Sequence, residues 1–469
     1  MRILLVKPIN KIYYVISPNL GLGYLATALR RAGFQVDILD SGKEGLTYEG
    51  FEKRLVQNHY DAVGLQMFSH EVESVKKHLS ITKRVDRAIH TVVGGPHPSG
   101  APRETLIEMD AADFGFVGEA EIGLPQLMRL LATGANAEDT LNAVPGLVWR
   151  NNQRIVVNEA RRPQQLDSLG FPAWDLTNPR DYPMAPHGTF SKRSPVAPII
   201  VTRGCPYRCS FCGGFNITGK RIRSRSVDDV IAEIGFLIDK YGIREVHIED
   251  DNFTFNRSLV TEFCETLIRN RIDITWSCPN GVRIDKLDPA LVRLMEKAGC
   301  HSLALGIESG SDRILRKMDK YLTTETIKRQ VEMIKNNSSI SLTGFFLIGY
   351  PGEDESDIEK SIAFARDLRI DKVSFMYAMP LPGTLLYREW IAKNGTKDMG
   401  WSKFFYYRIV PNLSDISARK LQTLQRRALL RFYLRPRIIL GLLKELRTRQ
   451  QYKSMYWRVR EVFFKSAVR

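Results

Sequence analysis

The stretch RGCPYRCSFCGG, residues 203–214, holds Cys205, Cys209 and Cys212, three of the six cysteines in this 469-residue chain. Three thiolates spaced CxxxCxxC can bind one face of an iron–sulfur cube and leave its fourth iron without a protein ligand. Zinc is the competing interpretation, although structural zinc sites use four ligands and the loop contains no histidine. The loop therefore predicts a metal centre with an open coordination position.

The cysteine loop follows the first of six strand-like segments between residues 196 and 395. These segments are APIIVT, EVHIED, ITWSCPNG, HSLALGIES, SLTGFFLIG and KVSFMYAMP, and each precedes an amphipathic helical pattern. Ser226, Asp288 and Thr323 or Thr324 mark helix starts. The alternation predicts a partial (β/α)6 barrel whose functional residues follow the carboxyl ends of the strands.

Residues 1–135 alternate short β-rich runs with helical patterns, which predicts a Rossmann-like parallel sheet covered on both faces. Glycines stand near its strand ends, where open α/β sheets bind ligands, but no GxGxxG follows the first strand, so a dinucleotide is disfavoured. Residues 136–195 are expected to be a connection with a hairpin, and residues 396–469 a basic helical region. The whole chain is thus predicted to be α/β.

The composition is that of a soluble globular protein, with 43% hydrophobic and 26% charged residues and no apolar run long enough to span a bilayer. MRILLVKPIN is expected to be a first strand and not a secretory signal. Six cysteines cannot form a disulfide framework in so long a chain. We therefore predict a reduced, cytoplasmic location.

The net charge of +16 is concentrated at the C-terminus. Residues 419–469 hold fifteen Lys or Arg and two acids, a difference of +13. RRALLRFYLRPRIILGLLKELRTRQ is amphipathic, and Pro436 divides it into at least two helices. Two interpretations stay open: a solvated basic surface packed on the barrel, or peripheral association with an anionic membrane at the inner face.

With Phe211 before its last cysteine, the loop resembles the signature of the radical S-adenosylmethionine (SAM) enzymes. The resemblance implies a 4Fe–4S cluster on the three cysteines and SAM contacts at later strand ends. For Asp250 and Asp251 the alternative role is helix capping, and for Arg283 the alternative is a solvated side chain. Cys264, Cys278 and Cys300 are expected to be core residues. The expected SAM contacts are Phe211, Asp250, Asp251, Arg283, Glu308 and Gly349, with Gly352 near the adenine.

A Rossmann-like module before such a barrel, with SPNLGLGYLATALR, VVGGPHPSG and VGEAE at its strand ends, is similar to the cobalamin-binding domain of B12-dependent radical SAM proteins. The DxHxxG motif is absent, so cobalamin is expected to bind without that histidine; His70 and His97 are expected in turns or on the surface. The expected cobalamin contacts are Gly21, Leu22, Gly23, Gly94, Gly95, Pro96, Gly118 and Glu119.

The resemblance implies a methyltransferase that acts on unactivated carbon or phosphorus and is reduced by flavodoxin or ferredoxin. Together with the basic helices it favours a hydrophobic substrate, of the hopanoid lipid type. A cyclase like the anaerobic magnesium-protoporphyrin monomethyl ester enzyme is an alternative, and a non-catalytic cobalamin or redox-sensing module is another. Nucleic acid is disfavoured as a partner, because the similar tRNA methylthiotransferases carry a second cysteine set and residues 1–204 contain none.

Overall fold

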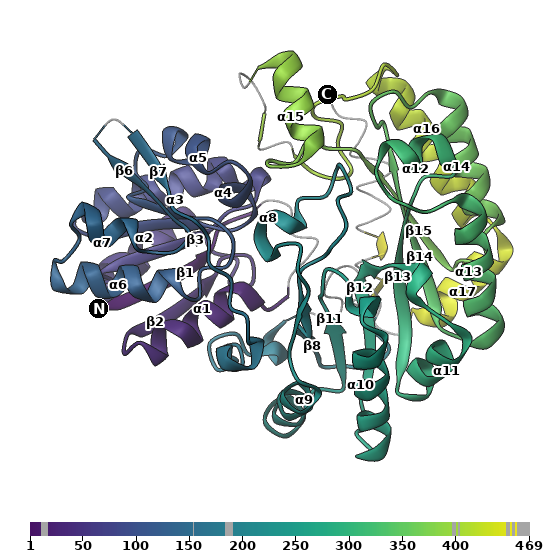
Figure 1. Ribbon diagram of the computed structural model, residues 1–469, viewed down its shortest axis with the longest axis horizontal. Helices are drawn as coiled ribbons and strands as arrows, with labels where there is room; N and C mark the ends of the chain where they lie inside the picture. The colour runs from purple at the N-terminus through teal and green to yellow at the C-terminus, as the bar shows by residue number, and fades with distance from the viewer. Residues whose placement is uncertain are drawn as a thin grey trace.

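The computed structural model describes residues 1–10, 17–152, 154–182, 191–395, 400–401, 404–446, 451–452 and 455–456. Figure 1 shows two lobes side by side: an N-terminal lobe around one sheet and a larger lobe around a second sheet. The predicted α/β class is confirmed. No helix in this part of the chain is long and apolar enough to span a membrane.

The N-terminal lobe is built on a seven-stranded sheet in the order β2-β1-β3-β4-β5-β6-β7. Its first five strands are parallel, and the order reverses between β2 and β3, on either side of β1. In such sheets the crevice at the reversal is the usual ligand site. The strands are β1 (Arg2–Lys7), β2 (Gln35–Asp40), β3 (Ala62–Gln66), β4 (His90–Gly94), β5 (Phe114–Phe116), β6 (Leu147–Asn151) and β7 (Arg154–Val157).

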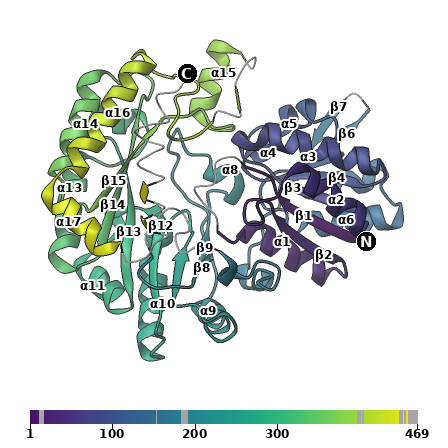
Figure 2. The same cartoon turned by 180° about the vertical axis from the view of Figure 1, so that it is seen from behind.

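Alternation along β1 explains why helices cover both faces of this sheet. Ile3 and Leu5 enter one buried apolar cluster, whereas Leu4 and Val6 enter another on the opposite face. Figure 2 shows the helices on both sides of the sheet. They are α1 (Leu20–Arg31), α2 (Tyr48–Asn58), α3 (Val72–Val85), α4 (Pro96–Gly100), α5 (Pro102–Glu108), α6 (Gly123–Thr133) and α7 (Glu138–Asn142).

The hairpin β6–β7 continues this sheet instead of lying in a free connection. The sequence places it within residues 136–195, but β6 pairs antiparallel with β5, with Phe114 opposite Trp149. An unpaired β5 would leave an open sheet edge, and the hairpin covers it. Local turn patterns predict that a hairpin forms; they do not predict which strand it joins.

The second lobe is a six-stranded parallel sheet in the order β15-β14-β13-β12-β11-β8, the partial barrel that the sequence predicts. Its helices start at the predicted caps: Ser226 accepts from the Asp229 amide, Asp288 from Leu291 and Thr323 from Thr326. The strands are β8 (Val196–Ile199), β11 (Glu245–Ile248), β12 (Thr275–Val282), β13 (Cys300–Glu308), β14 (Ser341–Ile348) and β15 (Lys372–Tyr377). The helices between them are α9 (Val227–Tyr241), α10 (Arg257–Arg269), α11 (Pro289–Lys297), α12 (Asp312–Lys317), α13 (Thr324–Asn337) and α14 (Glu355–Asp367).

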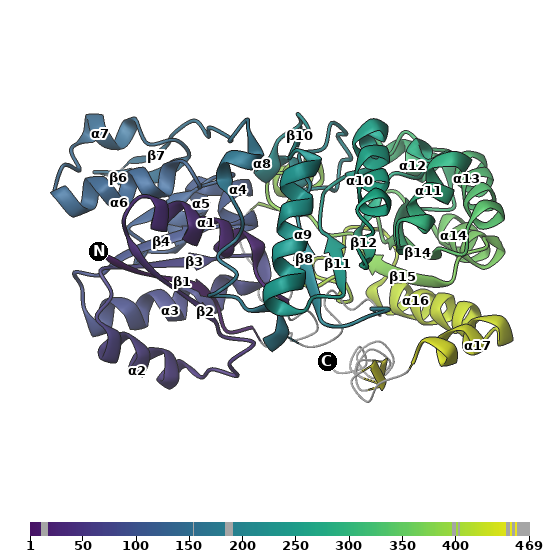
Figure 3. The ribbon, with the colours of Figure 1, turned by 90° about the horizontal axis from the view of Figure 1, so that it is seen from below.

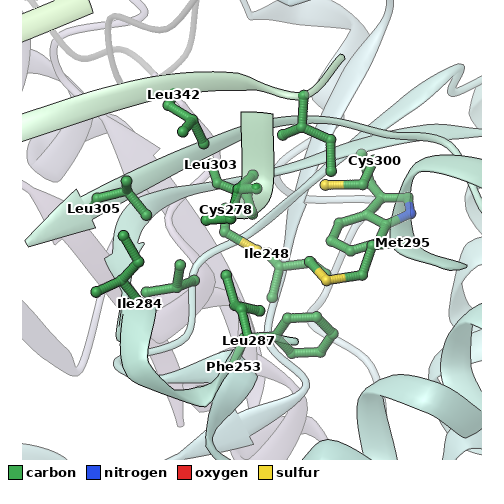
Figure 4. Close-up of a cluster of buried hydrophobic side chains, with 14 of the residues drawn as sticks. Ile248, Phe253, Cys278, Ile284, Leu287, Met295, Cys300, Leu303, Leu305 and Leu342 are labelled. Atoms are coloured by element: carbon green, nitrogen blue, oxygen red, sulfur yellow. The ribbon is translucent and has the colours of Figure 1, made fainter. Parts of the chain in front are cut away.

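The three cysteines outside the loop are core residues, as predicted. Cys264, Cys278 and Cys300 are at most 3% exposed and form no disulfide. Figure 4 shows Cys278 and Cys300 among aliphatic side chains such as Ile248 and Leu303. Their environment is that of small hydrophobic residues.

After β15 the chain forms α15 (Leu385–Asn394) and then two helices, α16 (Ala418–Tyr433) and α17 (Pro436–Glu445), divided at Pro436 as predicted. Figure 3 shows α16 and α17 beside β15 and α14, on the side of the barrel away from the N-terminal lobe. Gln425 donates to the Phe375 carbonyl and Tyr433 donates to the Val373 carbonyl, so α16 covers the open edge of β15. Residues 447–450, 453–454 and 457–469 of the basic tail lie outside the described residues.

The two lobes also meet beyond β15, at α4. A Cβ atom on Gly383 would lie 3.0 Å from the Gly100 Cα, and a side chain at Gly100 would collide with the Pro382 carbonyl. Nearby, the ring of Trp401 packs edge-on against His97, 4.8 Å between centroids. The N-terminal lobe therefore touches the last strand connection of the barrel as well as the first.

Candidate active site

The cysteine loop lies between the lobes, where the chain leaves β8. It is bounded by β9 (Thr202–Arg203) and by α8 (Gly214–Thr218), which Figure 1 shows between the lobes. The Cys205 amide donates to the Gly219 carbonyl (3.1 Å) and the Ser210 amide donates to the Met318 carbonyl (3.1 Å). These backbone bonds hold the loop in place without using any thiol.

The three thiols lie close enough for their charges to raise one another's pKa values, although no three His, Cys, Asp or Glu side chains of the described residues converge on a single metal ion. Loss of solvation, with the neighbouring Cys209 and Asp251 charges acting in the same direction, raises the pKa of Cys212 to about 12. Burial also raises the pKa values of Cys205 and Cys209. Three clustered thiolates are therefore unfavourable alone, and iron bound to them would supply the missing positive charge. The loop thus fits an iron–sulfur cluster.

Phe211, in the cysteine loop, packs into protein. It contacts an apolar cluster that includes Met318, Leu347 and Leu386. The Ser210 hydroxyl beside it is 2.7 Å from the Tyr350 hydroxyl. The expected SAM contact of Phe211 stays a prediction.

The two adjacent aspartates after β11 have different roles. Asp250 is 3% exposed, and its carboxylate accepts from the Val201 amide (2.8 Å) and from the amide and hydroxyl of Thr202 (both 2.7 Å). Burial raises the pKa of Asp250 to about 7, although these bonds oppose the shift. Both of its oxygens are thus engaged in holding the end of β8. Asp251 is exposed, lines the cavity between the lobes and accepts from the Thr218 hydroxyl at 2.5 Å.

Arg283, after β12, is buried. The alternative interpretation of Arg283 as a solvated side chain is therefore wrong. The Arg283 Nε donates to Asp285 (2.9 Å) and its Nη1 donates to the Lys320 carbonyl (2.8 Å). The guanidinium also lies 3.8 Å from the ring centroid of Tyr207, a residue of the cysteine loop. Arg283 therefore supports the loop through a cation–π contact.

The end of β13 carries an ion pair that the sequence does not reveal. Glu308, in the left-handed region at φ 66°, accepts from Lys320 Nζ at 2.8 Å, and both side chains are about nine-tenths buried. Burial alone would lower the pKa of Lys320, but Glu308 and then Cys209 raise it above the usual value. A fixed positive charge thus stands near the cysteines. Nothing in the local pattern around Lys320 distinguishes it from a surface lysine.

Gly349 and Gly352 follow β14 with positive φ, 75° and 72°. The Gly349 amide donates to Glu353 Oε2 at 2.6 Å, and the Tyr350 amide donates to the same oxygen. Burial raises the pKa of Glu353 to about 8. The glycines allow this tight turn, because a side chain is rarely tolerated at such φ values.

The cobalamin contacts predicted from the N-terminal lobe surround one cavity of about 320 Å³, with one exception. Gly23 faces away from it, because a Cβ there would lie 2.8 Å from Pro172 Cβ. Barrel residues, among them Thr202 and Asp251, line the same cavity. The predicted contacts that line it are Gly21, Leu22, Gly94, Gly95, Pro96, Gly118 and Glu119.

Glu119 also belongs to a buried ion-pair network between the lobes. Arg223 Nη1 donates to Glu119 Oε2 (2.9 Å), and Arg203 Nη1 lies 2.7 Å from Glu121 Oε1 and 3.2 Å from Glu119 Oε2. All four side chains are at most 7% exposed. Sequence reasoning missed both arginines and Glu121, because partners about 80 to 100 residues apart leave no local pattern. Buried carboxylates keep their charge only when paired in this way.

His97 is buried in α4, 2% exposed, and not a surface residue. Its Nδ1 is 3.0 Å from the Ser69 hydroxyl, and burial lowers its pKa to about 4. His70 is half-buried, with its Nε2 2.8 Å from Asn10 Nδ2 and its ring stacked on Phe68. Burial also lowers the pKa of His70 to about 4. Both imidazoles are therefore neutral near pH 7.

Two family models match the chain on the two lobes. The B12 binding domain matches residues 7–128, and the Radical SAM superfamily matches residues 199–365. An uncharacterized methyltransferase of Pyrococcus horikoshii is 31% identical over 449 residues, which cover 94% of each chain. Cytidylyl-2-hydroxyethylphosphonate methyltransferase of Streptomyces wedmorensis is 29% identical, over 79% of this chain and 77% of its own.

Two further comparisons bear on activity and fold. Anaerobic magnesium-protoporphyrin IX monomethyl ester cyclase of Rubrivivax gelatinosus is 27% identical, over 79% of this chain and 66% of its own. The structure of the radical SAM methyltransferase TsrM from Kitasatospora setae, with cobalamin and a 4Fe–4S cluster bound, has a TM-score of 0.69. It is 20% identical, and the match covers 84% of this chain and 78% of that one.

The two lobes and the cysteine loop between them define a radical SAM enzyme with a B12-binding domain. The chain belongs to the cobalamin-dependent radical SAM family, of the methyltransferase type. Its cofactors are a 4Fe–4S cluster, SAM and cobalamin, and it works with a small-molecule substrate and an electron donor. Membership of this enzyme family therefore favours an iron–sulfur cluster over a zinc site, and an enzyme over a non-catalytic cobalamin or redox-sensing module.

Proposed function

We propose that the enzyme transfers a methyl group to an unactivated carbon of a hydrophobic substrate. The observation that carries this proposal is the shared cavity: the glycine-rich edge of the N-terminal lobe and the barrel residues beside the cysteine loop line one space. A substrate carbon placed there would lie between the site of hydrogen removal and the methyl donor. An alkyl carbon is no nucleophile, so positioning takes the place of acid–base chemistry.

When bound, the cluster with SAM supplies a hydrogen-abstracting radical, and methylcobalamin supplies the methyl group. The protein side chains hold and orient these groups. Cys205, Cys209 and Cys212 would ligate three irons, and Asp251 would bind the SAM amine in place of the engaged Asp250. Lys320, beside Cys209 and Glu308, would stand next to the anionic carboxylate of SAM.

Apolar residues dominate the cavity wall and support a reaction that must exclude water. Leu22, Leu65 and Phe116 come from the N-terminal lobe, and Ile200 and Ile217 from the barrel side. Leu22 is held in α1 and Ile217 in α8, and the other three stand at strand ends, so the wall is preformed. A carbon radical held there would be shielded from solvent.

We further propose a polycyclic lipid of the hopanoid type, taken from a membrane surface. The support is an exposed apolar face on the last helices, where Leu434, Leu440 and Leu443 are 66%, 59% and 55% exposed. Leu440 and Leu443 are one turn apart on α17, and large exposed apolar patches are typical of a binding face. Arg437 and Lys444 flank the patch and would favour anionic headgroups.

The test is anaerobic reconstitution with iron, sulfide and cobalamin, followed by incubation with lipid extract, a low-potential chemical reductant and SAM carrying a deuterated methyl group. We expect a lipid product heavier by one deuterium-labelled methyl in place of a hydrogen. The same extract from cells lacking the gene should be without the unlabelled form of that product. Labelled methyl in water-soluble molecules only would contradict the lipid part of the proposal.

A cyclase is the second candidate, favoured by the similarity to the Rubrivivax enzyme. The same labelled incubation separates the two reactions. A product without added carbon, accompanied by 5′-deoxyadenosine, would show that the enzyme forms a ring and does not methylate its substrate.

A further inference from the structure

A hollow of about 470 Å³ lies beside the chain that follows the cysteine loop, and Thr218 separates it from the shared cavity. Residues 160–164 of the connection form one wall, and residues 218–223 after α8 form another. Arg161, Lys220 and Arg221 are exposed at this hollow. Among the described residues that line it, none is acidic.

The charges of these three exposed cations are not neutralised by the protein. None of the three has an ion-pair partner within the part of the chain that the structure describes. The buried Arg223 in the same wall differs, because Glu119 neutralises it. Arg162 donates through Nε to the Ile217 carbonyl (2.9 Å) and forms a fixed floor. The hollow therefore presents a net positive potential to solvent.

The same segment runs directly along the cluster loop. β10 (Arg223–Ser224) pairs antiparallel with β9, which places Arg223 opposite Arg203. The Cys205 amide donates to the Gly219 carbonyl at 3.1 Å. A side chain at Gly204 (φ 104°) would collide with the Arg221 carbonyl, so the two backbones are in contact. Lys220 and Arg221 thus flank a backbone that is hydrogen-bonded to a cluster ligand.

We propose that this cationic hollow, Arg161, Lys220 and Arg221, docks an acidic electron-transfer protein of the flavodoxin type. Gly219 lines the hollow and its carbonyl accepts from the Cys205 amide, so a partner seated there would lie next to the loop that would hold the cluster. In the step, an anionic flavin hydroquinone loses one electron and the oxidised cluster gains it; no covalent bond forms or breaks. The inference needs the cluster of this family and not the identity of the methylated substrate.

The test measures cluster reduction, not methylation. Reconstituted full-length protein is mixed anaerobically with fully reduced bacterial flavodoxin, and the loss of cluster absorbance is followed by stopped flow. Charge reversal in Lys220→Glu with Arg221→Glu should lower the bimolecular rate about tenfold at low ionic strength, because steering charges act mainly on association. The difference should shrink in high salt. Reduction by dithionite, a small reductant, should keep its rate.

The matched control is Lys328→Glu with Arg329→Glu, which reverses two exposed cations on α13, outside the hollow. It should react with flavodoxin like the wild type. Equal flavodoxin rates in the hollow variant and this control would overturn the proposal. If the Lys220 and Arg221 variant fails to assemble a cluster, the variant Arg161→Glu tests the proposal in the same assay. Arg161 lies in the connection between the lobes and not in the segment that contacts the cysteine loop. An unchanged rate in that variant also overturns the proposal.

Discussion

Lys320 Nζ lies 2.8 Å from Glu308 Oε1 at the mouth of the barrel, and neither side chain is more than 10% exposed. This pair places one positive charge beside Cys209, with its counter-charge on the strand that precedes it. A lone charge at this depth would be costly, so each partner requires the other.

Removal of one partner should therefore destabilise the fold. Lys320→Met leaves the Glu308 carboxylate buried without its cation, and we expect the free energy of unfolding to fall by about 3 kcal/mol. Urea denaturation of the apoprotein measures this. The double variant with Glu308→Gln should lose less than the single variant, and simple additivity would show that the two side chains are not coupled.

Glu353 should make stability depend on pH. Its pKa is about 8 in the folded protein against an ordinary value of 4.5, so the folded state holds the proton more tightly. The free energy of unfolding should then fall as the pH rises from about 5 to about 8. Glu353→Gln keeps an acceptor for the Gly349 and Tyr350 amides but does not titrate. We expect its advantage over the wild type to grow by about 3.5 kcal/mol across this range; parallel pH curves would contradict the shift.

The six cysteines should separate into two groups when the iron content is measured. Cys209→Ala should lose the cluster after anaerobic reconstitution, because two cysteines cannot hold the cube. Cys300→Ala, 3% exposed in the wild type, should keep its iron and lose about 1 kcal/mol of stability from the small cavity. Iron loss in the core variant with its fold intact would count against this division.

Loss of Arg203 should lower the free energy of unfolding more than loss of an exposed arginine. Arg203→Met leaves Glu121, and partly Glu119, without a cation between the lobes, which should cost about 3 kcal/mol. Arg84 pairs with Glu52, but its side chain is 60% exposed, so Arg84→Met should cost at most about 0.5 kcal/mol. Differential scanning calorimetry of the two apoproteins gives the comparison. Equal losses would mean that the network contributes no more than a surface pair.

The exposed leucines of α17 should govern membrane binding. Leu440→Glu with Leu443→Glu should weaken binding to vesicles rich in phosphatidylglycerol at least about tenfold, because each buried leucine contributes roughly 2 kcal/mol. Sedimentation with the vesicles measures the loss. Ile107 in α5 is 67% exposed, and Ile107→Glu serves as the control, with binding expected to stay at the wild-type level.

Local signals in the sequence predicted the framework well. The barrel strands and the caps at Ser226, Asp288 and Thr323 follow from hydrophobic period and from residues within one turn of each other. The CxxxCxxC spacing likewise predicted a cluster loop, because its three thiols lie within eight residues.

Long-range partners were not predictable in the same way. Two adjacent aspartates look equivalent in the sequence, yet Asp250 caps the backbone at Val201 and only Asp251 faces the cavity. Lys320 acquires its role from Glu308 across a loop, and Gly23 turns toward Pro172 from a different segment. Such choices depend on the folded neighbourhood, which no short window of sequence contains.

The contact of Gly100 with Pro382 limits how the enzyme can move. The six-stranded barrel is open between β8 and β15, and the first lobe is attached on both sides of the opening: by the arginine–glutamate network near β9 and by α4 against the chain after β15. Hinge opening at either margin would break buried contacts there. We therefore expect the two cofactor sites to keep a constant separation through turnover, so substrates must enter through side-chain or loop rearrangement and not by separation of the lobes.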